Sequence, residues 1–222
     1  IYGYGYDEYI PIGYKVETTF GYRSSVYNPA FYGGLSVRAG GFIPIGYLMG
    51  DVSIGTFYNF SDKRALQSAL NVKVSYFTNL LDAGRFKVRQ FASGNYLNGW
   101  NRLSGYDEAV WFTNESGPRE ISGSPLGTNR LVLSTETVVF TPWEPLGFRI
   151  ALYAYGDVGF LGYDRNVFNN QCFTTIGMGV RLKNERLVFG TIQLSLFVNF
   201  NKFGPTSREW IQLTSEQRIQ AT

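Results

Sequence analysis

Apolar and polar side chains alternate along most of this chain, and the pattern is clearest between residues 130 and 159. Two long alternating segments, residues 130–139 and 148–158, are joined by a proline-containing turn at residues 141–147. One face of each segment is nearly all apolar, whereas the other carries charges, tyrosines and small residues. Because successive side chains of a β-strand point to opposite faces, this period of two predicts a pair of strands with one apolar and one polar face.

The same alternation predicts further strands on both sides of this pair. Together with the two segments above, they give about nine strong strands, each near the 9–11 residues that cross a bilayer when tilted. The additional strands are expected at residues 14–23, 35–43, 48–60, 67–76, 85–96, 174–183 and 192–200. Two nearly identical turns, YIPIGY at residues 9–14 and FIPIGY at residues 42–47, imply that another strand precedes Ile10.

A long stretch of mixed polar sequence, at about residues 97–127, interrupts the strands and predicts a functional or disordered loop. We expect short turns at one end of the strand array and longer loops at the other, as in outer-membrane barrels. On this assignment the strand that ends at Phe200 finishes outside, whereas outer-membrane chains normally end inside. We therefore predict one more, weak strand at about residues 208–216, centred on residues 209–214.

Composition favours a sheet protein that keeps much of its surface out of water. Aromatic residues make up 17% of the 222 residues, and charged residues make up 17%, against roughly 25% in typical soluble domains. A soluble β-sandwich or lipocalin-like barrel also alternates. Charges on the expected inner faces, and aromatic residues near strand ends, favour a transmembrane barrel with interfacial aromatic belts.

Several classes of function are disfavoured by residues that the chain lacks. It contains no His and a single cysteine, Cys172, which removes Ser-His-Asp and Cys-His catalytic sites, His-ligated metals and any intrachain disulfide. The sequence has no run of about 18 apolar residues, so no transmembrane helix is predicted. The net charge of +3 is spread along the strands, which gives no nucleic-acid footprint. We expect no enzyme activity, no catalytic or metal-ligating residues and no cofactor.

Four motifs carry a resemblance to a known family. They are GTNRLVLSTE at residues 127–136, GFR at 147–149, YGDVG at 155–159 and GMGVRL at 177–182. The chain resembles the C-terminal part of BamA/TamA-type outer-membrane assembly barrels. The resemblance implies an all-β, antiparallel transmembrane β-barrel of sixteen strands, of which this chain supplies about the last ten. Residues 1–222 would then form one multi-pass barrel domain in the outer membrane of a Gram-negative bacterium, without the periplasmic POTRA repeats.

The resemblance also implies a lock between the long loop and the barrel wall. In that family a loop arginine, within a Val-Arg-Gly-Phe/Tyr motif, lies in the lumen against acidic residues of the following strands. Here Arg119 keeps the charge, while Glu120 and Ile121 replace the glycine and the aromatic residue. Its expected partners are Glu136 and Asp157, which alternation places on the polar face.

Two alternatives remain open for this lock. Residues 103–106, LSGY, keep the glycine and tyrosine of the motif but have a serine in place of the arginine. Alternatively, Asp157 pairs across its hairpin with Arg130, Glu136 pairs with another basic residue of the polar face, and Arg119 stays in solvent.

The function implied by the resemblance is the insertion or translocation of other proteins at the outer membrane. A weakly paired last strand, with Trp210, Ile211 and Leu213, would form one side of a seam that opens at low cost. Expected partners are outer-membrane lipids including lipopolysaccharide, client outer-membrane or secreted proteins, and periplasmic or lipoprotein subunits. The alternatives are a barrel that anchors a periplasmic domain or lipoprotein partners, and a passive pore.

Overall fold

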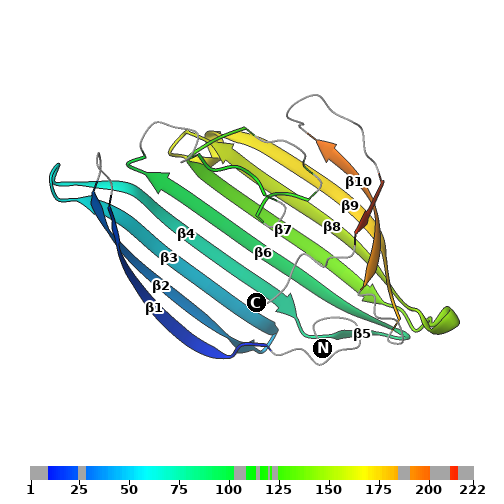
Figure 1. The fold of residues 1–222 in the computed structure, drawn as a ribbon. Helices are drawn as coiled ribbons and strands as arrows, with labels where there is room; N and C mark the ends of the chain where they lie inside the picture. Colours follow the sequence, from blue (N-terminus) through cyan, green and yellow to red (C-terminus); the bar gives the residue numbers. More distant parts are fainter. Residues whose placement is uncertain are drawn as a thin grey trace.

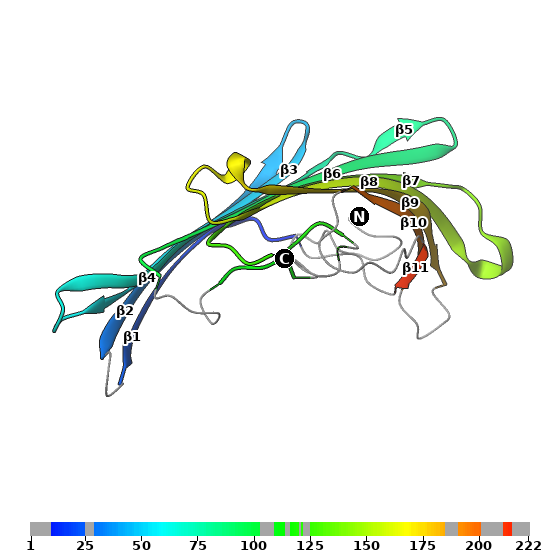
Figure 2. The same ribbon diagram turned by 90° about the horizontal axis from the view of Figure 1, so that it is seen from above.

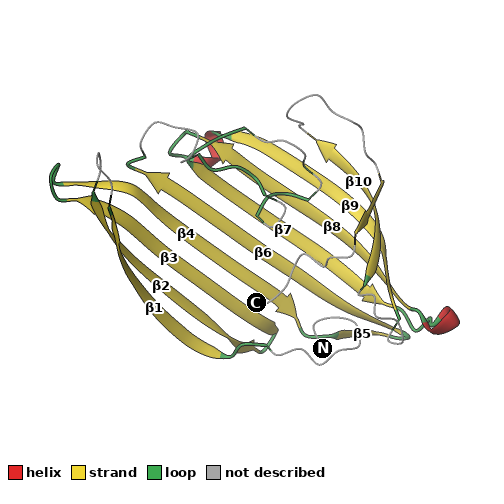
Figure 3. Cartoon of the chain, viewed as in Figure 1, coloured by secondary structure: helices red, strands yellow, loops and turns green. Residues whose placement is uncertain are grey.

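The chain folds into one antiparallel sheet of consecutive strands (Figure 1). A computed structural model describes residues 10–24, 29–102, 109–113, 116–119, 121, 125–184, 191–200 and 211–214. The strands are β1 (Gly13–Arg23), β2 (Ala30–Ile43), β3 (Gly46–Asn59), β4 (Arg64–Thr78), β5 (Leu81–Ala83), β6 (Phe86–Trp100), β7 (Asn129–Phe140), β8 (Arg149–Gly162), β9 (Gln171–Lys183), β10 (Ile192–Phe200) and β11 (Ile211–Thr214). The described helical segments are two short 3-10 turns, η2 (Pro145–Gly147) and η3 (Val167–Asn169), visible in Figure 3. No helix in these ranges has the length and apolar character needed to span a membrane.

Each strand pairs with its neighbours along the chain, in the order β1-β2-β3-β4-β6-β7-β8-β9-β10-β11, while β5 pairs with the start of β6. Within the described ranges the sheet is not closed, and β1 and β11 form its two edges. Seen from above, the sheet is strongly curved, and the described parts of the loop between β6 and β7 lie on its concave side (Figure 2). The all-β class and the antiparallel order agree with the prediction from alternation.

The nine strong strands predicted between residues 14 and 200 are all present, with changes at their ends. Strand β6 continues to Trp100, so the long loop covers residues 101–128 and begins later than expected. Strand β5 was not predicted and lies between the strands expected at residues 67–76 and 85–96. The last strand, described over Ile211–Thr214, falls within the predicted range, and the remaining positions of that range lie outside the described residues. The strand expected before Ile10 lies outside the described residues.

The expected separation of short turns from long loops is only partial. The two-residue turn at residues 44–45 lies at the opposite end of the sheet from the loop at residues 101–128, as expected. However, residues 60–63 form a four-residue turn at the same end as the long loop, and residues 141–148 form a longer connection at the other end. Neighbouring antiparallel strands can be joined by a tight turn at either end, so alternation alone does not fix loop lengths.

Cross-strand register gathers the apolar side chains on the convex face, away from the loop. One register row runs from β1 to β9 through Val16, Val37, Val52, Val72, Tyr96, Leu131, Phe160 and Cys172. Many large apolar side chains of this face are exposed, including Leu133 at 47%, Leu196 at 53% and Met178 at 63%. The sheet therefore presents a broad apolar surface that nothing in the described residues covers.

Aromatic side chains cluster at both ends of the strands. At the end that carries the long loop, Phe31 contacts Tyr22 and Phe60, with ring centroids 5.0 and 5.2 Å apart. At the other end, Phe86 and Trp143 meet edge to face at 6.0 Å. The apolar convex face is thus bordered by aromatic groups at both ends, in agreement with the sequence pattern.

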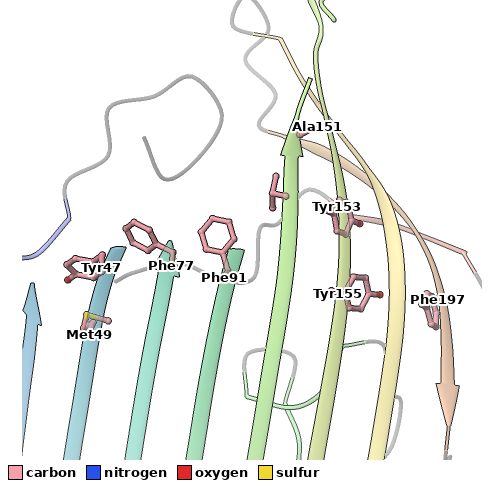
Figure 4. Close-up of a cluster of buried hydrophobic side chains, with 9 residues drawn as sticks. Tyr47, Met49, Phe77, Phe91, Ala151, Tyr153, Tyr155 and Phe197 are labelled. Atoms are coloured by element: carbon pink, nitrogen blue, oxygen red, sulfur yellow. The ribbon is translucent and has the colours of Figure 1, made fainter. Parts of the chain in front are cut away.

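The concave face is not uniformly polar. A cluster of buried hydrophobic side chains lies on it, drawn from β3, β4, β6, β7, β8 and β10 (Figure 4). Its members are Tyr47, Met49, Phe77, Phe91, Val138, Ala151, Tyr153, Tyr155 and Phe197. Two of these, Tyr153 and Tyr155, also contact the buried charges described next, so the apolar cluster and the polar site adjoin each other.

Candidate functional site

The long loop is held against the sheet by a bridge and by a close approach to a glycine. Residues Val110 and Gly127 pair through two backbone hydrogen bonds of 2.7 and 2.9 Å, which brings the two ends of the intervening segment together. A Cβ atom on Gly159 of β8 would lie 2.5 Å from Cγ of Pro118 and 2.9 Å from Cζ of Phe112. Since such distances are too short for real contacts, glycine at this position lets the loop lie directly on the strand.

This docking places Arg119 against Asp157 of β8. The guanidinium Nε and Nη2 donate to the two carboxylate oxygens at 2.8 and 3.1 Å, and the Arg119 backbone N–H donates to the same carboxylate at 2.8 Å. The Thr175 hydroxyl of β9 donates to the Arg119 carbonyl oxygen at 2.8 Å. Strands β8 and β9 therefore bind both the side chain and the backbone of Arg119.

Glu136 of β7 is shared between two arginines. Its Oε2 accepts from Arg119 Nη1 at 2.6 Å, and its Oε1 accepts from Arg181 Nη1 of β9 at 2.7 Å. Arg181 also donates through Nε to Gln193 Oε1 of β10 at 2.8 Å. Together with Asp157, the site thus contains two arginines and two carboxylates. These four side chains are between 0% and 7% exposed.

Two tyrosine rings lie under the two guanidinium groups. The Arg119 Cζ atom lies 4.0 Å from the ring centroid of Tyr155, and the Arg181 Cζ atom lies 4.3 Å from that of Tyr153. The rings are parallel to within 15°. This geometry adds cation–π attraction to the ion pairs.

Glycines on the neighbouring strand leave room for these rings. Gly177 and Gly179 of β9 lie opposite Tyr155 and Tyr153 in the register. A Cβ atom at Gly177 would come within 2.5 Å of the Tyr155 ring, and one at Gly179 within 2.6 Å of the Tyr153 hydroxyl. The rings can therefore lie across β9 only because both positions lack a side chain.

The electrostatics keep the loop arginine charged. Burial by itself lowers the pKa of Arg119, but Asp157 and Glu136 outweigh that effect, so the pKa is raised above its usual value. Each carboxylate is bound by at least one guanidinium group. Removing four charges from water is costly, and such a network fixes one arrangement rather than adding much net stability. The arrangement is suited to hold a loop in one place.

The structure brings together the three residues that were expected to form the lock. Arg119 contacts both Glu136 and Asp157. The alternative pair between Asp157 and Arg130 is not formed, because Arg130 donates to the Trp111 carbonyl and to the Asn95 side chain instead. Glu136 does meet a basic residue of the polar face, but it does so in addition to Arg119.

The other predicted site residues are placed only in part. Ile121 is described and half-buried, whereas Glu120 and the rival motif at residues 103–106 lie outside the described residues. Trp210 also lies outside them. Ile211 and Leu213 belong to β11, where they pair with Leu196 and Leu194 of β10.

Sequence reasoning missed several members of the network. Alternation placed Arg181 and Thr175 on the polar face of their strand, which is correct, but it did not predict which groups they would contact. The signal that was available is the pair of tyrosines on β8 with two glycines at the matching positions of β9. Large and small residues in register on neighbouring strands indicate a ring that lies across its neighbour.

No group of three or more metal-ligating side chains occurs among the residues that the structure describes. No family model, curated protein or solved structure matches this chain. The fold and the geometry of the loop site are therefore the grounds for the functional proposal.

Proposed function

We propose that this chain forms the C-terminal part of an outer-membrane β-barrel whose convex face meets lipid. The observation that carries the proposal is the outward side of the sheet. Along the register rows from β1 to β10, no described position of that side carries a charged residue. A surface of this size and character is expected in contact with hydrocarbon rather than with water.

The height of the apolar surface fits a bilayer. Outward-facing Leu48 and Tyr58 of β3 are ten residues apart, which corresponds to about 33 Å along a strand. At a tilt of about 40°, this length projects to about 25 Å, the height of the apolar band of outer-membrane barrels. The aromatic clusters at both strand ends fit the two membrane interfaces.

Within that barrel, the proposed work is to help other proteins insert into or cross the outer membrane. The motifs that resemble BamA/TamA-type proteins and the loop lock of Arg119 support this function. The short last strand supports it as well. Among the described residues, strand β11 pairs with Gln193, Leu194, Ser195 and Leu196 of the nine-residue β10. An edge held by few pairs opens at low cost and can template an incoming strand.

Site-specific crosslinking tests this proposal in the intact outer membrane. A photocrosslinking residue at Leu213, in the short last strand, is expected to capture nascent barrel or secreted chains. The same residue at Leu133, on the convex face and three strands away from β10, is the matched control and is expected to capture lipid. Equal capture of clients at the two positions, or none at Leu213, would contradict the assembly function.

A passive pore is separated from assembly by planar-bilayer conductance. The loop lock and the buried aromatic cluster both lie on the concave face, so the wild-type protein is expected to conduct little. A large, steady conductance in the wild type would favour the pore.

A further inference from the structure

The wall of the sheet recognises nearly every polar group of one arginine residue. The backbone N–H of Arg119 donates to Asp157, and its carbonyl oxygen accepts from Thr175. Three guanidinium nitrogens bind Asp157 and Glu136, and the ring of Tyr155 lies under the charged group. These contacts involve the backbone and the side chain of Arg119 together, so they form a binding site for a whole arginine residue and not a single ion pair.

The receptor groups belong to the sheet, not to the loop. Glu136 lies directly opposite Tyr155 in the register, and Asp157 lies directly opposite Thr175. Backbone ladders of β7, β8 and β9 therefore hold the four side chains in place whether or not the loop is present. We call these four residues the arginine pocket.

The pocket is left unbalanced if the loop departs. Glu136 keeps Arg181 as a partner, because each arginine binds a different oxygen of its carboxylate. In the described part of the chain, by contrast, every hydrogen bond and ion pair of Asp157 is made with Arg119. A carboxylate without a partner on the concave face is unfavourable, which favours the entry of another cation.

We propose that the arginine pocket is a peptide-binding site, filled in cis by the loop and open in trans to an extended segment of another polypeptide that carries arginine. The geometry selects arginine over lysine, because Asp157 is bound by two parallel N–H groups and a planar group stacks on Tyr155. A proline or another small residue is expected before the arginine, since Pro118 lies directly over Gly159. This inference goes beyond membrane assembly, because it names a ligand and does not require client insertion.

The loop and the external segment compete for the same pocket. A tethered loop acts at a local concentration of the order of millimolar, so an external peptide binds the wild type weakly. Release of the loop exposes the pocket, so occupancy by one segment excludes the other. The loop is in this sense an internal competitor.

The test uses the purified full chain in detergent micelles and a labelled hexapeptide, SGPREI, which copies residues 116–121. The Arg119→Met variant removes the guanidinium group from Asp157 and Glu136, so the loop no longer fills the charged part of the pocket. Fluorescence anisotropy is expected to show at least about tenfold tighter binding to this variant than to the wild type. Peptides with lysine or citrulline in place of the arginine are expected to bind at least about tenfold more weakly.

The matched control adds Asp157→Asn to Arg119→Met and is expected to abolish the gain. If the gain survives this control, or if the arginine and citrulline peptides bind alike, the proposal is wrong. A second variant, Phe112→Ser, loosens the loop at its edge-to-face contact with Phe173 and alters no pocket residue. It too is expected to bind the arginine peptide more tightly than the wild type, and wild-type affinity there would count against the proposal. Binding is measured without client proteins, so its failure leaves the crosslinking result for assembly unaffected, and the reverse also holds.

Discussion

The substitution Asp157→Asn probes the loop lock with the smallest change of shape. The wild-type carboxylate accepts three hydrogen bonds from Arg119, of 2.8, 2.8 and 3.1 Å. An asparagine whose amide oxygen keeps the two shorter bonds turns its NH₂ group toward Arg119 Nη2. The change therefore removes one charge-assisted bond, weakens two others and brings two donors face to face.

The magnitude follows from the burial of the pair. A hydrogen bond to a charged group contributes about 1.5–3 kcal/mol, and breaking a buried ion pair by changing one partner costs about 3–5 kcal/mol. Both side chains of this pair are at most 5% exposed, so solvent offers little compensation. We expect Asp157→Asn to weaken the docking of the loop by about 3–5 kcal/mol.

Two measurements separate loop release from global unfolding. Cleavage by an added protease reports opening of residues 101–128, and denaturant unfolding in detergent reports the sheet. The matched control is Asp62→Asn, because Asp62 forms an exposed pair with Arg64 at 3.6 Å, worth at most about 1 kcal/mol. In a double-mutant cycle, Asp157→Asn is expected to have a much smaller effect on loop docking in the Arg119→Met background than in the wild type. The expected coupling energy between the two residues is about 2–3 kcal/mol. The reasoning fails if Asp157→Asn behaves like Asp62→Asn in both assays.

Two further predictions concern the two faces of the sheet. Met178→Arg, near the middle of the convex face, is expected to destabilise the protein in lipid by about 2–4 kcal/mol, and Ile192→Arg at a strand end by about 0–1 kcal/mol; equal costs in vesicle unfolding would argue against a lipid-facing surface. Gly177→Ala would place a Cβ 2.5 Å from the Tyr155 ring and is expected to cost about 1–3 kcal/mol. The control Gly50→Ala, whose Cβ would meet nothing within 4 Å, is expected to be nearly neutral, and similar melting temperatures for the two variants would refute the ring-over-glycine packing.

Much of this architecture could be predicted from local pattern. The alternation between residues 130 and 158 placed Glu136 and Asp157 on the face that the loop covers, because a strand has a side-chain period of two. The same rule placed Leu133 and Leu152 on the exposed face. Strand β5 escaped prediction because three residues are too few to show a period.

The contacts within the site could not be predicted in the same way. Whether Glu136 meets Arg119, Arg181 or both depends on the register of three strands and on the path of a loop that shows no period. Gly159 leaves room for Pro118, and Gly177 leaves room for the Tyr155 ring. From the sequence, however, a glycine in a strand does not indicate which neighbour will fill the space above it.

The amino-acid order thus fixes the strands and their two faces, because alternation is a local property of an extended chain. The sharing of one glutamate by two arginines depends on the folded sheet, as does the enclosure of a loop arginine between Asp157, Thr175 and Tyr155. Those contacts join residues up to 56 positions apart, and their geometry exists only after hydrogen-bonded strands have set the register. The physical reason is that alternation specifies only the face to which a side chain points. A contact also requires a short distance between atoms of different strands, and only the folded sheet sets that distance.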